Sequence, residues 1–152
     1  MNATTSSRRF WTLNALGWGG YAMYGLWAGM RIGGGVVFSG IVLITVSVAA
    51  CLWLCSGMLR AVALRQRWWE GSLGSLVLKL AAGVVAGASV AQAMTAGLVL
   101  PALALGWVQL PGGHADYRWS SLLVYWMNTA LFLLMWTGLW AGLHGLRRAR
   151  HS

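Results

Sequence analysis

Histidine and cysteine are the side chains of this sequence best suited to ligand or redox chemistry, and they are few. The histidines are His114, His144 and His151, and the two cysteines, Cys51 and Cys55, stand four residues apart. A bis-histidine haem needs two histidines on facing helices, and a metal site needs more ligands than this spacing supplies. We therefore expect no metal or cofactor of the chain's own, although His144 or His114 could contact a peripheral pigment or ligand.

Acidic side chains, which catalysis and ion coupling usually require, are rarer still. The sequence has two, Glu70 and Asp116, against eleven Lys and Arg. Neither lies in a long apolar stretch, so a catalytic triad and the ionisable groups of an ion-coupled transporter are both missing at membrane depth. We predict that the protein is not an enzyme. A polar cluster around His114 and Asp116 could bind a small ligand, but a polar turn explains it equally well.

Four blocks of sequence without a charged residue form the elements that would position these candidate side chains. They cover residues 10–30, 32–59, 80–115 and 119–146, and each is long enough for a bilayer-spanning helix, which needs about 20 apolar residues. Only 9% of the residues are charged, whereas a soluble domain has about 25%. The sequence predicts one all-α polytopic membrane domain over residues 1–152, with spans at 10–30, 36–59, 80–105 and 122–146. Residues 60–78 are expected to form an interfacial loop on one side, and residues 106–119 a loop on the other.

Basic residues are distributed unevenly among the connections between these blocks. Nine of the eleven lie before the first block, between the second and third, or after the fourth, and only Arg31 and Arg118 lie elsewhere. Cytoplasmic loops are enriched in Lys and Arg, so both termini are predicted to be cytoplasmic, in the inner membrane of a bacterium. This distribution favours contact with lipid headgroups over nucleic-acid binding. The predicted headgroup contacts are Arg8, Arg9, Arg65, Arg67, Arg147 and Arg148.

Glycines recur at a spacing that suits close packing of helices. Within the predicted spans, three G-x-x-x-G patterns begin at Gly25, Gly83 and Gly138, and such patterns allow two helix backbones to approach each other. The helix at 80–105 has small or polar residues on two opposite faces, so we expect it to be the most deeply buried of the four. The glycines predicted to pack against neighbouring helices are Gly25, Gly29, Gly83, Gly87, Gly97, Gly138 and Gly142.

Amide side chains are the strongest hydrogen-bonding groups within the apolar blocks. We predict that Asn14, Gln92 and Asn128 make polar contacts between helices, each contributing about 0.6 kcal/mol. For Gln92 the alternative is contact with a ligand or ion. Asn14 and Asn128 lie at different depths, so we do not expect them to pair.

An aromatic stripe runs along the last block. Trp136, Trp140 and His144 follow one another at helical spacing and therefore share a face of the helix. We expect this stripe to face the membrane interface, where indole rings sit at headgroup depth, with His144 touching headgroups.

Two segments of the sequence carry a resemblance to a known family. The first is Arg8-Arg9-Phe-Trp-Thr-Leu-Asn-Ala-Leu-Gly-Trp-Gly-Gly-Tyr21, and the second is Leu131-Phe-Leu-Leu-Met-Trp136 through Leu143-His-Gly-Leu-Arg147-Arg148. They resemble the first and last membrane helices of LytS/AlgZ-like sensor histidine kinases. The resemblance implies four spans, cytoplasmic termini and a sensory input role. Residues 1–152 contain no counterpart of the phosphoacceptor histidine motif or the ATP-binding region of that family, so no catalytic residue carries over.

Two functional hypotheses follow from the sequence. The first is a non-catalytic accessory or structural subunit of a larger membrane complex, of respiratory or photosynthetic type, whose partners are other transmembrane subunits and membrane lipids. The alternative is a stand-alone sensory input module of the kind that the resemblance implies.

Overall fold

The computed structural model describes residues 3–36, 38–113 and 119–151, with side chains from Arg8 onward. Its elements are α1 (Ala3–Ile32), α2 (Ser39–Arg65), the 3₁₀ turn η1 (Trp68–Glu70), α3 (Leu73–Ala104), the 3₁₀ turn η2 (Pro111–Gly113) and α4 (Trp119–Arg150). No strand occurs in these ranges, so the predicted all-helical class is confirmed. Within the described ranges, α2, α3 and α4 are long and apolar enough to cross a membrane, which supports the prediction of a membrane protein.

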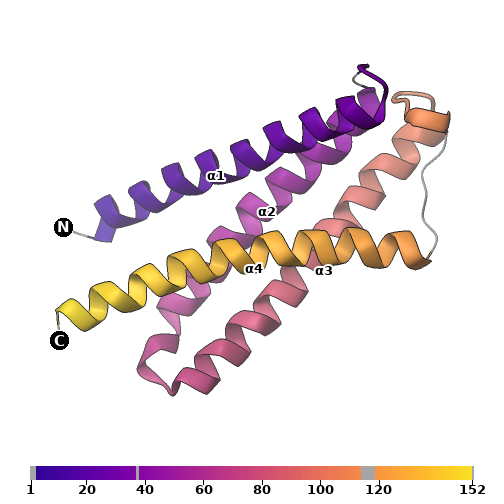
Figure 1. The fold of residues 1–152 in the computed structure, drawn as a ribbon. Coiled ribbons are helices and arrows are strands. Elements are labelled where there is room, and N and C mark those ends of the chain that lie inside the picture. Colours follow the sequence, from indigo (N-terminus) through magenta and orange to yellow (C-terminus); the bar gives the residue numbers. More distant parts are fainter. Residues whose placement is uncertain (1–2, 37, 114–118, 152) are drawn as a thin grey trace.

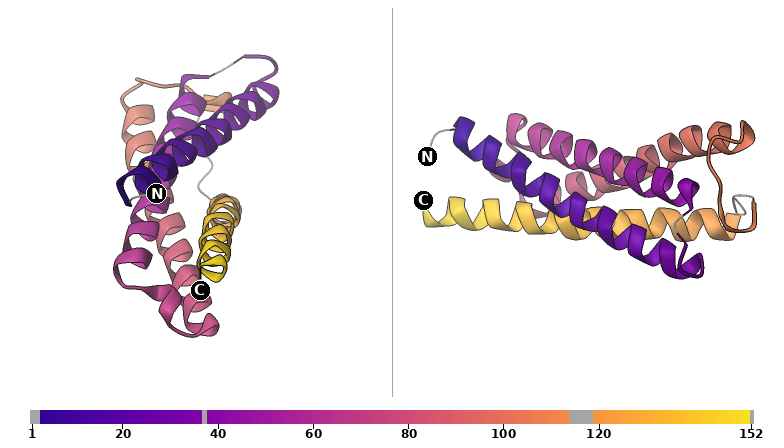
Figure 2. Two further views of the ribbon diagram at one scale, coloured as in Figure 1. Left: turned by 90° about the vertical axis from the view of Figure 1, so that its left-hand side faces the viewer. Right: turned by 90° about the horizontal axis from the view of Figure 1, so that it is seen from above.

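Successive helices of the four run in opposite directions along the bundle (Figure 1). Both described ends of the chain and the α2–α3 turn lie at one end of the bundle, and the other two connections lie at the opposite end (Figures 1 and 2). We call the first end the basic end. Its cationic residues are Arg8, Arg9, Arg60, Arg65, Arg67, Lys79, Arg147, Arg148 and Arg150.

Local sequence explains how the chain turns between helices. Gly34 and Gly35, after α1, have φ angles of +69° and +94°, which glycine adopts without the steric cost that a side chain would add. Before α3, the hydroxyl of Ser72 accepts a hydrogen bond of 3.2 Å from the backbone N–H of Ser75. This bond satisfies one of the free N–H groups at the start of the helix.

The bounds predicted for the interfacial loop, residues 60–78, are wrong. Helix α2 continues to Arg65 and α3 begins at Leu73, so only a tight turn containing η1 joins them. The sequence between residues 60 and 65 contains no glycine or proline that would stop a helix. Because arginine side chains can reach headgroups from a helical backbone, charge does not require the helix to end at the hydrocarbon boundary.

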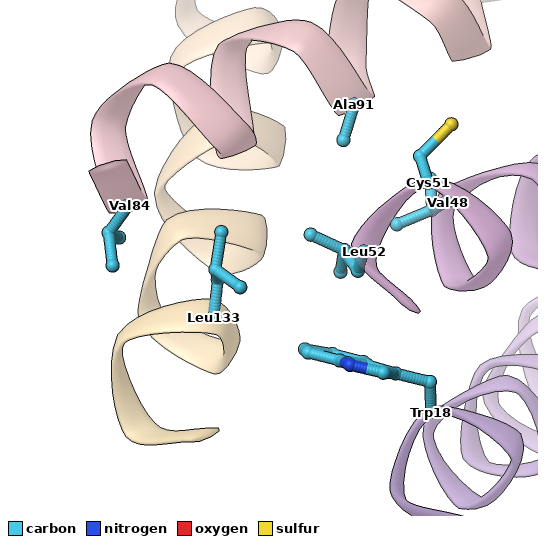
Figure 3. Packing of buried hydrophobic residues seen from close by; sticks show 7 residues of the cluster. All are labelled: Trp18, Val48, Cys51, Leu52, Val84, Ala91 and Leu133. Carbon is cyan, nitrogen blue, oxygen red and sulfur yellow. The ribbon is translucent and has the colours of Figure 1, made fainter. Parts of the chain in front are cut away.

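The expectation that the third helix is the most buried is also wrong. In the most apolar stretch of α2, 44% of the residues are buried, against 11% in α3. Helix α2 packs against α1 and α3 and also reaches α4, and so it occupies the centre of the bundle. Figure 3 shows Leu52 of α2 between Trp18 of α1 and Leu133 of α4, and Leu52 is fully buried.

Candidate functional site

The most developed polar feature inside the bundle centres on Asn14 of α1, which is fully buried. Its Nδ2 donates a hydrogen bond of 3.0 Å to the carbonyl oxygen of Trp53 in α2. Its Oδ1 accepts one of 2.9 Å from the Ser56 hydroxyl and one of 2.7 Å from the indole N–H of Trp136 in α4. Asn14 therefore joins three helices through one amide.

Ser56 extends this network towards the middle of α1. Its hydroxyl oxygen accepts a hydrogen bond of 3.0 Å from the indole N–H of Trp18. The single hydroxyl hydrogen of Ser56 has two acceptors in reach, Asn14 Oδ1 and the carbonyl oxygen of Trp53 at 3.1 Å. We name Asn14, Trp18, Trp53, Ser56 and Trp136 the Asn14 network.

A second set of polar contacts joins α3 to α4. Nε2 of Gln92 donates a hydrogen bond of 2.6 Å to the Thr129 hydroxyl, which is almost completely buried. The indole N–H of Trp126 donates one of 3.0 Å to the Ser89 hydroxyl. Asn128 takes a different partner from Asn14, because its side chain hydrogen-bonds with Tyr21 of α1. Each of the three predicted amides thus has a partner on another helix within this chain.

The seven glycines predicted to pack divide into two groups. A Cβ added at Gly25 or Gly29 would collide with Thr45 or Ile41 of α2. One added at Gly83 would collide with Leu59, and one at Gly87 would lie 2.9 Å from Cδ2 of Leu133. These four glycines therefore allow neighbouring helices to approach. The positions that meet no atom within 4 Å are Gly97, Gly138 and Gly142.

The aromatic stripe of α4 faces the bundle, so the prediction that it faces the membrane interface is wrong. Trp136 binds Asn14, and Trp140 is buried, with its ring 6.3 Å from that of Phe10 in α1 and 5.9 Å from that of Trp69. The ring of His144 lies 4.4 Å from that of Trp69. The stripe points inwards because the large rings fill the space between α4 and its neighbours, which lipid would otherwise occupy.

Arginines at the basic end occupy two kinds of position. Arg8, Arg9, Arg65, Arg67, Arg147 and Arg148, the predicted headgroup contacts, are all exposed. Arg60 is different, since it is half-buried and its guanidinium carbon lies 4.2 Å from the centroid of the Phe10 ring. A guanidinium placed over an aromatic face is held there by the ring quadrupole.

A groove of about 580 Å³ opens between α3 and α4. Its walls are almost entirely apolar and include Val84, Val85, Val124 and Leu131, with Asn128 also contributing. The groove suits a lipid acyl chain better than a polar ligand.

Metal-ligating groups do not come together in the described part of the chain, where no three His, Cys, Asp or Glu side chains form a cluster. Cys51 belongs to the apolar core, and the Cys55 thiol lies 3.9 Å from the carbonyl oxygen of Gly87. His114, together with the polar cluster around it, lies outside the described residues. The expectations about a cofactor or a peripheral pigment therefore stay predictions.

Comparisons with models of known protein families, with curated protein sequences and with solved structures find no match to this chain. The resemblance to LytS/AlgZ-like kinases stays a prediction.

Sequence reasoning found Asn14 but missed its partners. Nothing in the spacing of Ser56 marks it, and the helical spacing of Trp136, Trp140 and His144 predicts a shared face but not that this face points towards Asn14. The sequence predicts that a loop begins at Arg60, whereas this residue lies in α2, five positions before the end of the helix, and its guanidinium lies over the Phe10 ring. A helical periodicity extended past the last apolar residue of the block would have found it.

Proposed function

We propose that this protein is a non-catalytic module of the bacterial inner membrane that acts by helix packing, as an accessory subunit of a larger membrane complex. All four helices span the bilayer in this proposal, including α1, and the basic end faces the cytoplasm. The uneven distribution of Lys and Arg supports that orientation. The placement of both described ends of the chain with the α2–α3 turn at one end of the bundle is consistent with it (Figure 1).

One observation carries this proposal. The amides of Asn14 and Gln92, the groups inside the bundle best able to bind a polar ligand, already bind Trp53, Ser56, Trp136 and Thr129 within the chain. Their hydrogen bonds fix the helices to one another and so serve structure. The outer faces of the helices are then the surfaces through which the protein acts.

The outer face of α4 is where we expect a partner helix to pack. Gly138 and Gly142 point into open space there, and the neighbouring leucines Leu139 and Leu143 are 60% and 54% exposed. A second transmembrane helix could approach the α4 backbone at these two glycines. The partner in this proposal is a transmembrane subunit of an energy-converting complex.

The experiment is purification from native membranes in mild detergent, with quantitative mass spectrometry of the proteins that accompany the tagged chain. The test variant replaces both Gly138 and Gly142 by Leu, and the control is Gly97→Leu, another glycine with no neighbour within 4 Å. We expect subunits of one complex to be lost in the test variant and kept in the control. Equal recovery in both variants would reject α4 as the contact face.

A specific contact favours the alternative function, a sensory input module. The two segments that resemble LytS/AlgZ-like kinases pack against each other, through the bond from Trp136 to Asn14 and through Tyr21 and Phe132, whose ring centroids are 5.0 Å apart. The same purification separates the two functions. Recovery of a histidine kinase or response regulator would favour the input module, and recovery of respiratory or photosynthetic subunits would favour the accessory role.

A further inference from the structure

The basic end brings arginines from two helices to one place. Arg60 of α2 lies over Phe10, and its charge is close enough to that of Arg147 in α4 for the two to repel each other. Arg60, Arg147 and Arg148 all act electrostatically on His144. Arg147 and Arg148 lie in the last turn of α4, and Arg60, held over Phe10, is the cation of α2 whose charge interacts with that of Arg147.

These arginines have no carboxylate to balance them. Glu70 is the one acidic residue in the described ranges, and it lies 4.0 Å from Arg67, with both side chains well exposed. Gathering like charges at a half-buried position is unfavourable unless an anion offsets them. Among the residues that the structure describes, no acidic side chain pairs with Arg60, Arg147 or Arg148.

A buried hydrogen-bond donor in the same cluster also lacks an acceptor. The indole Nε1 of Trp140 is buried and has no hydrogen-bond partner among the described residues, and Trp140 is 9% exposed. Its ring packs against Phe10, the residue that holds Arg60, and against Trp69, which contacts His144. Buried indole N–H groups normally find a partner. The aromatic cluster that holds Arg60 through Phe10 thus also contains a donor without an acceptor among the described residues.

The position of this aromatic cluster, near the ends of α2 and α4, indicates which kind of anion would bind there. Trp68, Trp69 and Trp140 gather where α2 and α4 approach their ends, and tryptophan is enriched at the depth of lipid headgroups. Apolar side chains that suit acyl chains are exposed nearby, with Met58 at 65% and Leu146 at 60%. A lipid with an anionic headgroup fits both the arginines and the exposed apolar side chains, whereas free phosphate fits only the arginines. Basic sites between transmembrane helices are known to bind such lipids.

We propose that the basic end contains one discrete binding site for an anionic phospholipid, formed by Arg60 of α2 and by Arg147 and Arg148 of α4, with the phosphate between them and with Arg65 outside the site. The inference rests on the membrane placement proposed above, but not on the accessory role. With three arginines at the site, a lipid that has two phosphodiester groups, such as cardiolipin, is expected to bind more tightly than phosphatidylglycerol. Zwitterionic phosphatidylcholine is expected to bind weakly.

The test is native mass spectrometry of the delipidated full chain in detergent, titrated separately with cardiolipin, phosphatidylglycerol, phosphatidylcholine and inorganic phosphate. We expect one cardiolipin to bind saturably. The variant Arg60→Gln should lower the affinity by about 10-fold or more, which is the effect of losing one charge-assisted hydrogen bond. The control is Arg65→Gln, which removes the same charge from an exposed position on the same helix and should change the affinity less than about 2-fold.

Two further variants guard against a purely structural effect. Arg60→Lys keeps the charge and should retain most of the binding, and the double variant Arg147→Gln with Arg148→Gln, at exposed positions, should weaken binding without disturbing the helices. If Arg60→Gln does not fold, as judged by circular dichroism, the double variant decides the question.

Equal effects of the Arg60→Gln and Arg65→Gln variants, or equal binding of phosphatidylcholine, would overturn the site and leave only diffuse attraction. Competition by inorganic phosphate at concentrations similar to those of cardiolipin would overturn the lipid as its occupant. Either failure leaves the helix-packing function untouched, because that function is judged by the proteins recovered with the Gly138 and Gly142 variant.

Discussion

Replacing Asn14 by Ala tests whether the Asn14 network holds α1, α2 and α4 together. The substitution removes hydrogen bonds of 3.0, 2.9 and 2.7 Å to Trp53, Ser56 and Trp136. At an average of about 0.6 kcal/mol for a hydrogen bond between helices in a membrane, the three bonds together contribute about 2 kcal/mol.

Loss of the Asn14 amide would affect its hydrogen-bond partners Ser56 and Trp136 differently. Ser56 can turn its hydroxyl hydrogen to the carbonyl oxygen of Trp53, 3.1 Å away. Trp136 Nε1 has no such alternative, and a buried donor without a partner costs about 1–3 kcal/mol. We therefore expect Asn14→Ala to destabilise the bundle by about 3–5 kcal/mol, the sum of the lost hydrogen bonds and the unpaired Trp136 donor. Asn128→Ala, at an exposed position, should cost less than about 1 kcal/mol.

The assay is reversible unfolding in mixed micelles with increasing sodium dodecyl sulfate, followed by far-ultraviolet circular dichroism, because tryptophan fluorescence would change with the variants themselves. A double-mutant cycle with Asn14→Ala and Trp136→Phe isolates the bond between α1 and α4, and its coupling energy should be about 0.6–1.7 kcal/mol. A coupling energy near zero, or an Asn14→Ala variant as stable as the Asn128→Ala control, would refute the network as a structural anchor.

Three further predictions follow from the packing and the charge distribution. Gly87→Leu should destabilise the bundle by about 1–3 kcal/mol in the same assay, since even a Cβ there would lie 2.9 Å from Cδ2 of Leu133. The control Gly97→Leu, at a position with no neighbour within 4 Å, should have almost no effect. Equal costs of the two substitutions would contradict the packing at Gly87. After both cysteines are replaced by Ala, Val36→Cys should react with impermeant thiol reagents from outside the cell and Gly74→Cys only from the cytoplasm; the reverse pattern would invert the topology. The purified chain should show no stoichiometric haem absorption, because His144 is the one histidine within the helices that the structure describes and an axial pair needs two; a stoichiometric haem spectrum would contradict this ligand count.

The sequence predicted the helices well and their orientations poorly, for a physical reason. Charge-free blocks identify spans because a charged side chain is costly in hydrocarbon. The same blocks are apolar on every side, so their periodicity does not mark which face is buried. Trp136 and Trp140 were therefore assigned to the membrane interface, although they face the bundle.

The G-x-x-x-G patterns predict where a helix backbone can be approached closely, but they do not predict which helix packs there. Gly25 and Gly83 each have a neighbouring side chain where a Cβ would be, whereas Gly138, in the same G-x-x-x-G pattern, has none. The pattern states that a backbone can be approached, but the approaching helix is determined by the rest of the fold. The end of α2 is predicted too early for a similar reason. The sequence shows where charged residues begin, at Arg60, but the helix continues through Arg60 to Arg65.

The distribution of small and large side chains explains how these four helices share one core. Backbone approach is extensive between α1 and α2, between α2 and α3 and between α3 and α4, where glycines provide room. Helices α1 and α4 meet chiefly through rings: the Trp136 ring lies where a Cβ of Gly17 would be, Tyr21 contacts Phe132, and Phe10 contacts Trp140. The contact between α1 and α4 is therefore stabilised by buried aromatic area and by two directional bonds, one from Trp136 to Asn14 and one between Asn128 and Tyr21, rather than by close approach of the two backbones.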